Sequence, residues 1–330
     1  MYSRTLATLS FALLLPFAVS AQSFSGLGNT DSFSVSVTPQ YPAPDSLVTL
    51  SFLSSSLTLT SATMTIIANG KQIYKGSVQP VAVILGKTGS TTLVKVTILS
   101  AGTAHSQSLV LQPQDVSLIA EPLSSAPALY PGKPLVPIEG STRVVAVANI
   151  VDARGRILDP GTLVYTWTVE GAGIANSSGI GKSSLTVASP LQYRERAVSV
   201  VVQSQDGSLT GRASLTLSPS NPTVRIYEND PLLGIRFDHA LSGSYSIAGA
   251  ESSLYAAPFS LPLLNGNPFI QWFLNGAVAQ TGTVITLRPA GNGQGNASLS
   301  LTASRDASSL ATANLSLSFG ATSSTNLFGL

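Results

Sequence analysis

The chain has no cysteine and few charged residues for its length. Without cysteine it can form no disulfide, carry no thiolate nucleophile and bear no lipid on a cysteine behind an export signal. Charged residues make up 10% of its 330 residues, against about 25% in ordinary soluble domains. The formal net charge is +2, and no basic stripe is present, which argues against nucleic-acid binding. Low net charge also gives little repulsion between copies of the chain, so self-association is possible.

The N-terminus has the features of a cleaved signal peptide. Arg4 gives a basic start, Leu6 to Ala18 are mostly apolar, and Val19-Ser20-Ala21 supplies the small residues at which a signal peptidase cuts. The apolar run is shorter than the about 20 residues of a membrane-spanning helix; an uncleaved anchor is the alternative. No later segment is apolar enough to span a membrane. We therefore expect removal of residues 1–21 and a place outside the cell or in its envelope, and export without disulfides favours a bacterial source.

Three copies of one pattern, an extended apolar segment that ends in a glycine turn, divide the chain. The copies are Thr65–Gly70, Thr166–Gly171 and Gln271–Gly276. They lie about 100 residues apart, which is the size of one small domain and not of a solenoid repeat. The spacing therefore predicts one domain type repeated three times.

Apolar residues alternate with Ser or Thr along most of the chain, for example in Phe33 to Thr38, Leu47 to Phe52 and Leu57 to Thr60. This alternation is typical of half-buried antiparallel strands. Each repeat offers about seven such strands separated by turn signals, as in an immunoglobulin-like sandwich. We therefore predict an all-β fold, a tandem array of three immunoglobulin-like β-sandwich domains after a signal peptide. The expected ranges are 1–21 for the signal peptide, 22–113, 114–219 and 220–320 for the domains, and 321–330 for a C-terminal tail.

The predicted cores depend on large residues at equivalent positions. Trp167 and Trp272 occupy the place of the core tryptophan of such sandwiches, and Ile66 replaces it in the first repeat. The second repeat also has a proline-rich insertion, Leu123 to Gly140, which we expect to be an ordered loop packed along its own sandwich. Prolines between the repeats predict short, stiff links.

Fragments that imitate catalytic motifs lack the context that the chemistry needs. Gly179 to Ser183 resembles the end of a phosphate-binding loop, but the earlier glycine is missing and a strand pattern follows where a helix is required. Lys87-Thr88-Gly89 matches one β-lactamase element, with no Ser-Xaa-Xaa-Lys beside it. The two histidines, His105 in an expected hairpin turn and His239 in the third repeat, should lie far apart. We predict no enzyme, no cofactor, and no catalytic, cofactor-binding or metal-binding residues.

The densest polar cluster follows the second link between repeats. Glu228, Asp230 and Asp238 could supply the hard oxygen ligands that calcium prefers. The alternative is a structural turn, since Asp-Pro is common in turns, with Arg225 and Arg236 as partners for the carboxylates. The sequence favours the turn and leaves calcium binding open.

The chain resembles a group of exported proteins. The segments that carry the resemblance are Arg225–Phe237, Ser253–Ala257, Trp272–Gly276 and Thr325–Leu330. They look like multi-domain proteins of uncultivated, small-genomed bacteria of the candidate phyla. Repeats two and three also resemble polycystic-kidney-disease-type modules, of whose pattern they keep the Trp and the Gly. The resemblance implies export and sandwich domains, and it implies no activity.

We expect a structural or adhesive cell-envelope protein that acts as a spacer or as a subunit of a surface assembly, with a protein or glycan partner. The alternative is a glycan- or protein-binding module that uses loops at one end of the array. Exposed loop aromatics would favour the alternative; Tyr255, Phe259 and Phe269 are the candidates, with core packing favoured for all three. The apolar end of the tail, Asn326 to Leu330, could add a strand to a partner's sheet edge.

Overall fold

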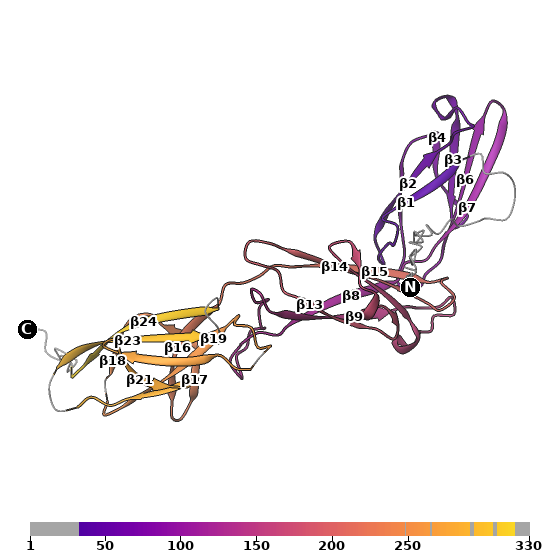
Figure 1. Ribbon diagram of the computed structural model, residues 1–330. Helices are drawn as coiled ribbons and strands as arrows, with labels where there is room; N and C mark the ends of the chain where they lie inside the picture. The colour runs from indigo at the N-terminus through magenta and orange to yellow at the C-terminus, as the bar shows by residue number, and fades with distance from the viewer. Residues whose placement is uncertain (1–32, 248, 265, 291–293, 306–308, 321–330) are drawn as a thin grey trace, which may run out of the picture. The chain divides into compact units, whose positions relative to one another are not determined.

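The computed structural model describes residues 33–320 except 248, 265, 291–293 and 306–308 (Figure 1). In this part of the chain six sheets form three immunoglobulin-like β-sandwiches, so the predicted fold class is confirmed. The predicted signal peptide and the C-terminal tail lie outside the described residues. No helix of the described part has the length and apolar character needed to cross a membrane.

The chain divides into two compact units. Of the described residues, one unit comprises 33–37, Thr49–Val81 and Thr92–Leu111. The other comprises Thr38–Val48, Ala82–Thr91 and the described residues of 112–320. The second and third sandwiches therefore belong to the same unit.

The first sandwich has sheets of order β1-β2-β5 and β4-β3-β6-β7. Its elements are β1 (Ser34–Thr38), β2 (Leu47–Leu53), η1 (Leu59–Ser61), β3 (Thr63–Ala68), β4 (Lys71–Ser77), β5 (Val81–Ile84), β6 (Thr92–Ser100) and β7 (Thr103–Leu111). Two predictions are wrong here. The strand expected at Leu57 to Thr60 does not form: a bend leads into the 3₁₀ turn η1, because Ser54 Oγ accepts the Leu57 N–H and diverts the backbone from a ladder. His105 lies within β7 opposite Ile98, since the hairpin turn falls earlier, at Ala101-Gly102.

The second sandwich has sheets of order β13-β9-β8 and β11-β10-β14-β15, with β12 also paired to β10. Its elements are β8 (Asp115–Pro122), β9 (Ser141–Asn149), η2 (Pro160–Thr162), β10 (Val164–Val169), β11 (Ala172–Gly173), η3 (Ala175–Ser177), β12 (Gly179–Ile180), β13 (Ser184–Ala188), β14 (Arg196–Gln203) and β15 (Thr210–Leu217). Alternate residues of the facing strands point inward, and they form one core around Trp167.

The third sandwich has sheets of order β17-β16-β19-β22 and β18-β24-β23-β20-β21. Its strands are β16 (Thr223–Asp230), β17 (Gly234–Leu241), β18 (Gly243–Ile247), β19 (Ser252–Phe259), β20 (Phe269–Leu274), β21 (Ala277–Thr281), β22 (Val284–Leu287), β23 (Gly295–Ser304) and β24 (Leu310–Phe319). β16 and β17 form a hairpin at one edge, after which the chain crosses to the other sheet, where β18 runs parallel to β24. The core surrounds Trp272.

The repeated glycine turn has the same geometry in all three sandwiches. Its two central residues have positive φ, at 48° and 79° for Asn69-Gly70, 50° and 79° for Glu170-Gly171, and 49° and 81° for Asn275-Gly276, as in the type I′ turns that fit twisted hairpins. In each copy the first turn residue also accepts a backbone N–H of the neighbouring strand through its side chain, from Leu93, Ala197 and Ser298 at 2.8, 2.7 and 2.9 Å. The turn therefore ties the hairpin to the next strand.

The residues predicted to fill the cores are buried. Ile66, Trp167 and Trp272 each have 0% of their surface exposed. Both indole nitrogens are satisfied, because Trp167 Nε1 donates to the Lys182 carbonyl at 2.8 Å and Trp272 Nε1 to the Gly282 carbonyl at 2.9 Å. A buried indole without such a partner would destabilise the fold.

Candidate functional site

The proline-rich insertion Leu123–Gly140, which we call the junction loop, connects β8 to β9 of the second sandwich and pairs with the third. Leu263 N donates to Leu123 O at 3.0 Å, Ser260 N to Ser125 O at 3.0 Å, and Ser125 N to Leu261 O at 2.8 Å. The expectation that this loop packs along its own sandwich is therefore right only in part: Val136 packs against the core of the second sandwich, but the start of the loop pairs with the third. The reason is local: the chain stays extended after β8, so its free edge meets the segment that follows β19.

Buried side chains reinforce this pairing. Ser125 is 5% exposed, and its Oγ accepts the Leu261 N–H at 3.0 Å. Ser124 is 3% exposed and donates to Leu135 O at 2.6 Å within the loop. Further along, Ser220 N, in the link between the sandwiches, donates to Val136 O at 2.8 Å. Most polar groups of the junction are thus paired, which favours one fixed arrangement; among the described residues the buried Ser260 Oγ is the exception and has no hydrogen-bond partner.

Aromatic rings extend the junction across the outer face of the third sandwich. Tyr130 of the junction loop meets Phe259 with ring centroids 4.9 Å apart and Phe237 with centroids 5.7 Å apart, both edge to face. Phe237 also packs edge to face on Tyr227 and Tyr255. Tyr227 is only 2% exposed although the Trp272 core lies on the opposite side of its strand. The loop and β17 therefore build a second, aromatic core between the two sandwiches.

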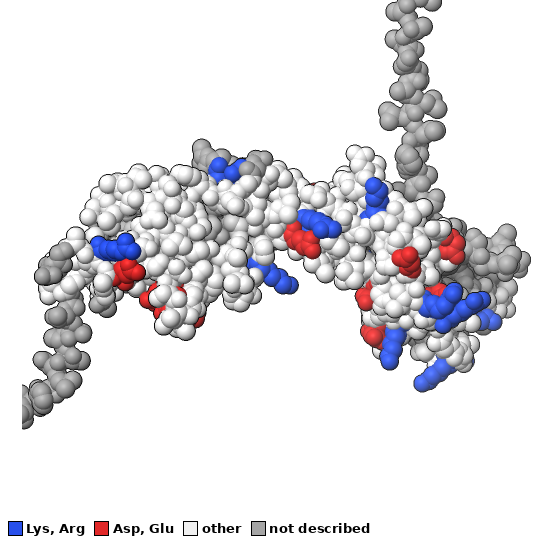
Figure 2. Space-filling view, turned by 90° about the horizontal axis from the view of Figure 1, so that it is seen from below, with Lys and Arg blue, Asp and Glu red and all other residues white. Residues whose placement is uncertain are grey.

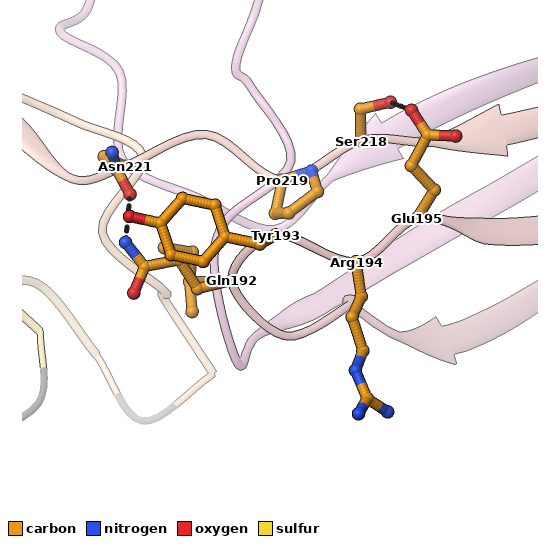
Figure 3. A pocket seen from close by; sticks show the side chains of 8 residues that line it. Gln192, Tyr193, Arg194, Glu195, Ser218, Pro219 and Asn221 are labelled. Carbon is orange, nitrogen blue, oxygen red and sulfur yellow. Dashed lines mark hydrogen bonds between the residues drawn. The ribbon is translucent and has the colours of Figure 1, made fainter.

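A shallow pocket of about 280 Å³ lies beside this junction (Figure 3). Its walls come from the turn between β13 and β14 and from the link after β15. Gln192 Nε2 donates to Asn221 Oδ1 at 3.2 Å, and Ser218 Oγ donates to Glu195 Oε1 at 3.0 Å, so side chains of the turn and the link hold each other. The pocket is framed by Ile138, Gln192, Tyr193, Arg194, Glu195, Ser218, Pro219 and Asn221.

Tyr193 is the most exposed aromatic side chain at this pocket, with 92% of its surface accessible and a φ of 60°. A bulky residue in the left-handed region is strained. In Figure 3 the ring lies next to Pro219 and the Gln192–Asn221 pair, while Arg194 points away. Hydrogen-bond donors and acceptors of the described lining residues surround one ring, and among them the Glu195 carboxylate accepts the Ser218 hydroxyl. A surface of this composition can bind a ligand.

The carboxylates considered for calcium have other partners. Asp230 Oδ1 accepts the N–H groups of Leu233 and Leu232 at 2.9 and 2.8 Å, and these bonds lower the pKa of Asp230. Asp238 pairs with Arg236 at 3.2 Å, and this hydrogen bond lowers the pKa of Asp238. Glu228 accepts the Tyr245 hydroxyl at 3.3 Å. Within the described residues no group of three His, Asp or Glu side chains could hold a metal ion.

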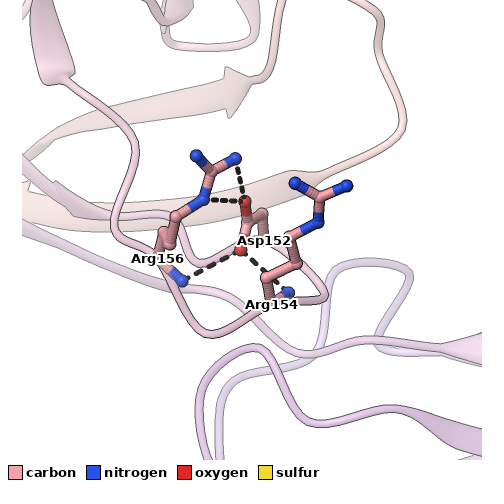
Figure 4. Close-up of polar contacts among 3 residues, drawn as sticks. All are labelled: Asp152, Arg154 and Arg156. Atoms are coloured by element: carbon pink, nitrogen blue, oxygen red, sulfur yellow. Dashed lines mark hydrogen bonds and ion pairs between the residues drawn. The ribbon is translucent and has the colours of Figure 1, made fainter.

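Another carboxylate organises a turn of the second sandwich (Figure 4). Asp152 accepts the backbone N–H groups of Arg154 and Arg156, each at 2.9 Å, and pairs with the Arg156 guanidinium at 2.8 Å. The backbone bond from Arg156 is the main cause that lowers the pKa of Asp152. This is a structural turn of the kind that Asp commonly stabilises.

The fragment that resembles a phosphate-binding loop behaves as a turn. Gly179–Ile180 form the short strand β12, and Ser184–Ala188 continue as β13 where a phosphate site would need a helix. Gly181 has a φ of 70°, and a Cβ there would lie 3.0 Å from the Gly161 carbonyl oxygen. The glycine is thus required by the backbone, not by a ligand.

Of the three aromatics proposed as ligand contacts, two lie in the junction and one is free. Tyr255 and Phe259 are half-buried within the aromatic core. Phe269 is 56% exposed, so the expectation that it packs in the core is wrong. In β20 it lies on the face opposite Ile270 and Trp272, which fill the core. Sequence reasoning missed Tyr130 and Phe237, whose pairing depends on a contact between two domains, and Tyr193, which stands alone in a loop.

No protein-family model and no curated protein match the chain. Solved structures similar to it include the three N-terminal domains of the outer capsid protein Hoc of bacteriophage RB49, 14% identical over 88% of this chain and 99% of that chain, with a TM-score of 0.23. Fibronectin(III)-like modules of Clostridium thermocellum CbhA are 11% identical over 60% and 95%, with a TM-score of 0.23. Immunoglobulin domains 1–5 of Sidekick-1 are 10% identical over 89% and 60%, with a TM-score of 0.30. Likenesses this weak carry no argument about function, and the resemblance to candidate-phylum proteins stays a hypothesis.

Proposed function

We propose that this is an exported structural or adhesive protein of the cell envelope, whose sandwiches act as a spacer or as a subunit of a surface assembly. The observation that carries the proposal is the junction loop. It places backbone and serine hydrogen bonds and a mostly half-buried aromatic core between the second and third sandwiches. A spacer must keep its modules at a fixed separation, and a joint of this kind resists bending in a way that a single peptide link does not.

Three features of the sequence support the same role. The N-terminal segment has the pattern of an export signal, the repeats follow one another in tandem, and the surface is weakly charged. We propose the domain ranges 22–113, 114–219 and 220–320, with the junction loop as the part of the second domain that completes the third. Partners would be proteins or glycans of the envelope.

The stiffness of the joint can be measured directly. Because the chain has no cysteine, a thiol-reactive spin label attaches only to cysteines that are introduced. Ser214→Cys in β15 and Thr312→Cys in β24 place one label on each of two exposed positions. Pulsed electron paramagnetic resonance should give one narrow distance distribution between them. Introducing Ser125→Pro, which removes the N–H that donates to Leu261 O, should broaden it. A broad distribution in the labelled protein without Ser125→Pro would contradict a spacer role.

The location is tested separately on intact cells. We expect the protein in the envelope or medium fraction, accessible to added protease, and joined to envelope components by chemical crosslinking. A protein retained in the cytoplasm would refute export, and a freely diffusing monomer without crosslinked partners would refute assembly.

A further inference from the structure

The five-stranded sheet of the third sandwich, β18-β24-β23-β20-β21, has no charged residue in any strand. The equivalent sheet of the second sandwich carries Arg196 and Arg212, and that of the first carries Lys71, Lys75 and Lys95. Figure 2 shows one face of the molecule, on which blue and red side chains stand in groups with wide white areas between them. The absence of charged residues from the strands of this sheet is therefore specific to the third domain. The fold does not explain it, because the equivalent sheets of the other two domains carry charged residues.

The outward positions of this sheet form rows of hydroxyl and amide groups. Ser244 on β18 lies opposite Ser316 on β24, and Ser316 lies opposite Ser298 on β23. A second row joins Ser246, Ser318 and Asn296, and a third joins Thr312, Thr302 and Gln271. Neighbouring strands are about 4.8 Å apart, so four strands present these groups across roughly 14 Å. The result is a broad surface of uncharged donors and acceptors.

The first two rows border a groove. Its volume is about 530 Å³, and the hydrogen-bonding groups that line it are Ser244, Asn275, Asn296, Ser298, Ser316 and Ser318. The Asn275 Oδ1 accepts a hydrogen bond from the Ser298 N–H at 2.9 Å, which fixes the side chain. The N–H groups of the Asn275 amide are then left as donors for a ligand. The groove is therefore lined by uncharged groups, several of them held in place by the sheet.

Aromatic and apolar side chains flank these rows on the same face. Phe269 and Phe273 of β20 lie opposite Ser304 and Ser300 of β23. Phe269 is 56% exposed, and Val278 of β21, the cross-strand partner of Phe273, is 61% exposed. Aromatic rings next to hydroxyl and amide groups match a ligand with apolar ring faces and hydroxyl edges.

We propose that the outer face of this sheet binds a neutral polysaccharide. An ionic ligand would find no opposite charge there, and the buried centre of a protein interface is commonly more apolar than the hydroxyl-rich centre of this face. A neutral glycan can stack on Phe269 and exchange hydrogen bonds with the serine and asparagine rows. The site differs from the loop surface expected from the sequence, and it does not depend on the spacer role.

The test uses the full-length protein and three neutral probes: cellulose, chitin and soluble dextran. Retention on the solids, or retardation in a dextran-containing native gel, should occur with at least one probe and be insensitive to salt. Ser316→Arg places a charge in the rows, and Phe269→Ala removes the exposed ring; each should weaken binding at least tenfold. The matched control Thr216→Arg alters the equivalent exposed position of β15 in the second sandwich and should bind as the unmodified protein does.

Several outcomes would overturn the proposal. Absence of binding to all three probes would do so, as would unchanged binding by Ser316→Arg and Phe269→Ala with circular-dichroism spectra that show intact folds. A protein that binds no probe but sediments as a dimer, and becomes a monomer on Ser316→Arg, would assign the face to self-association. The spin-label distances that test the spacer role are measured without glycan. A negative result in the glycan-binding test therefore does not contradict the spacer role, and a negative result in the distance test does not contradict glycan binding.

Discussion

Replacing Tyr130 by Ala should loosen the junction without unfolding either sandwich. The ring makes two edge-to-face contacts, at 4.9 and 5.7 Å, and is half-buried. Pairs of this kind contribute about 0.5–1.5 kcal/mol each beyond the area they bury. Adding the apolar area of a half-buried ring, at about 25 cal/mol per Å², gives a loss of roughly 2–4 kcal/mol in the closed state of the junction. Because the ring belongs to neither the Trp167 nor the Trp272 core, the global stability of each sandwich should change much less.

Hydrogen exchange measured by mass spectrometry separates these effects. The amides of Ser260, Leu261 and Leu263 are protected by bonds to the junction loop, so their exchange should accelerate about 30-fold or more, given that 1.4 kcal/mol corresponds to a factor of ten. Amides of β23 and β24 should be unaffected. Tyr130→Phe keeps the ring and should behave as the unmodified protein does. Unchanged exchange at these three amides in Tyr130→Ala would refute the role assigned to the ring.

Three further predictions concern the sandwiches themselves. Trp272→Ala should destabilise the third sandwich by about 3–5 kcal/mol, because it empties a fully buried site; urea unfolding measures this, and a loss below about 1 kcal/mol would contradict the core assignment. Gly171→Ala should lower the free energy of unfolding by about 1–2 kcal/mol. The cause is backbone strain, because the φ of Gly171 is 79° and there is open space around it. The control Gly173→Ala lies in the same hairpin without a positive φ and should leave the melting temperature unchanged. Asp206 has a pKa lowered below 3.8, mainly by the Ser204 hydroxyl. Its stabilising effect is complete above that value and lost as the pH falls through the lowered one, so Asp206→Ala should reduce the melting temperature at pH 7 and progressively less in acid; a pH-independent difference would contradict this.

The sandwiches and their cores could be predicted from the sequence because their signals are local. Three patterns predict where a residue lies within its own domain: the period-two alternation, the glycine turns and the positions of the tryptophans. The 3₁₀ turn at Leu59–Ser61 was missed because the Ser54 hydroxyl competes with the strand pattern.

The junction and the uncharged sheet could not be predicted in this way. Leu123–Ser125 read as part of a proline-rich loop, and their partners at Ser260–Leu263 lie more than one domain away in sequence. Phe269 follows the apolar pattern of a core strand, and only the register of β20 shows that it faces outward. These sites depend on pairing between segments far apart in the sequence and on which face of a strand each residue occupies. Neither can be read from a single sequence.

The pairing of the junction loop with the third sandwich has a consequence for how such arrays are assembled over evolutionary time. A module that is complete in itself can be duplicated, deleted or exchanged at its links. The second module here carries a segment that closes its successor, so a copy without that successor would expose an open strand edge and the Tyr130 ring, both of which promote aggregation. The two modules should therefore be inherited as an inseparable pair, and recombination is not expected at the link after β15.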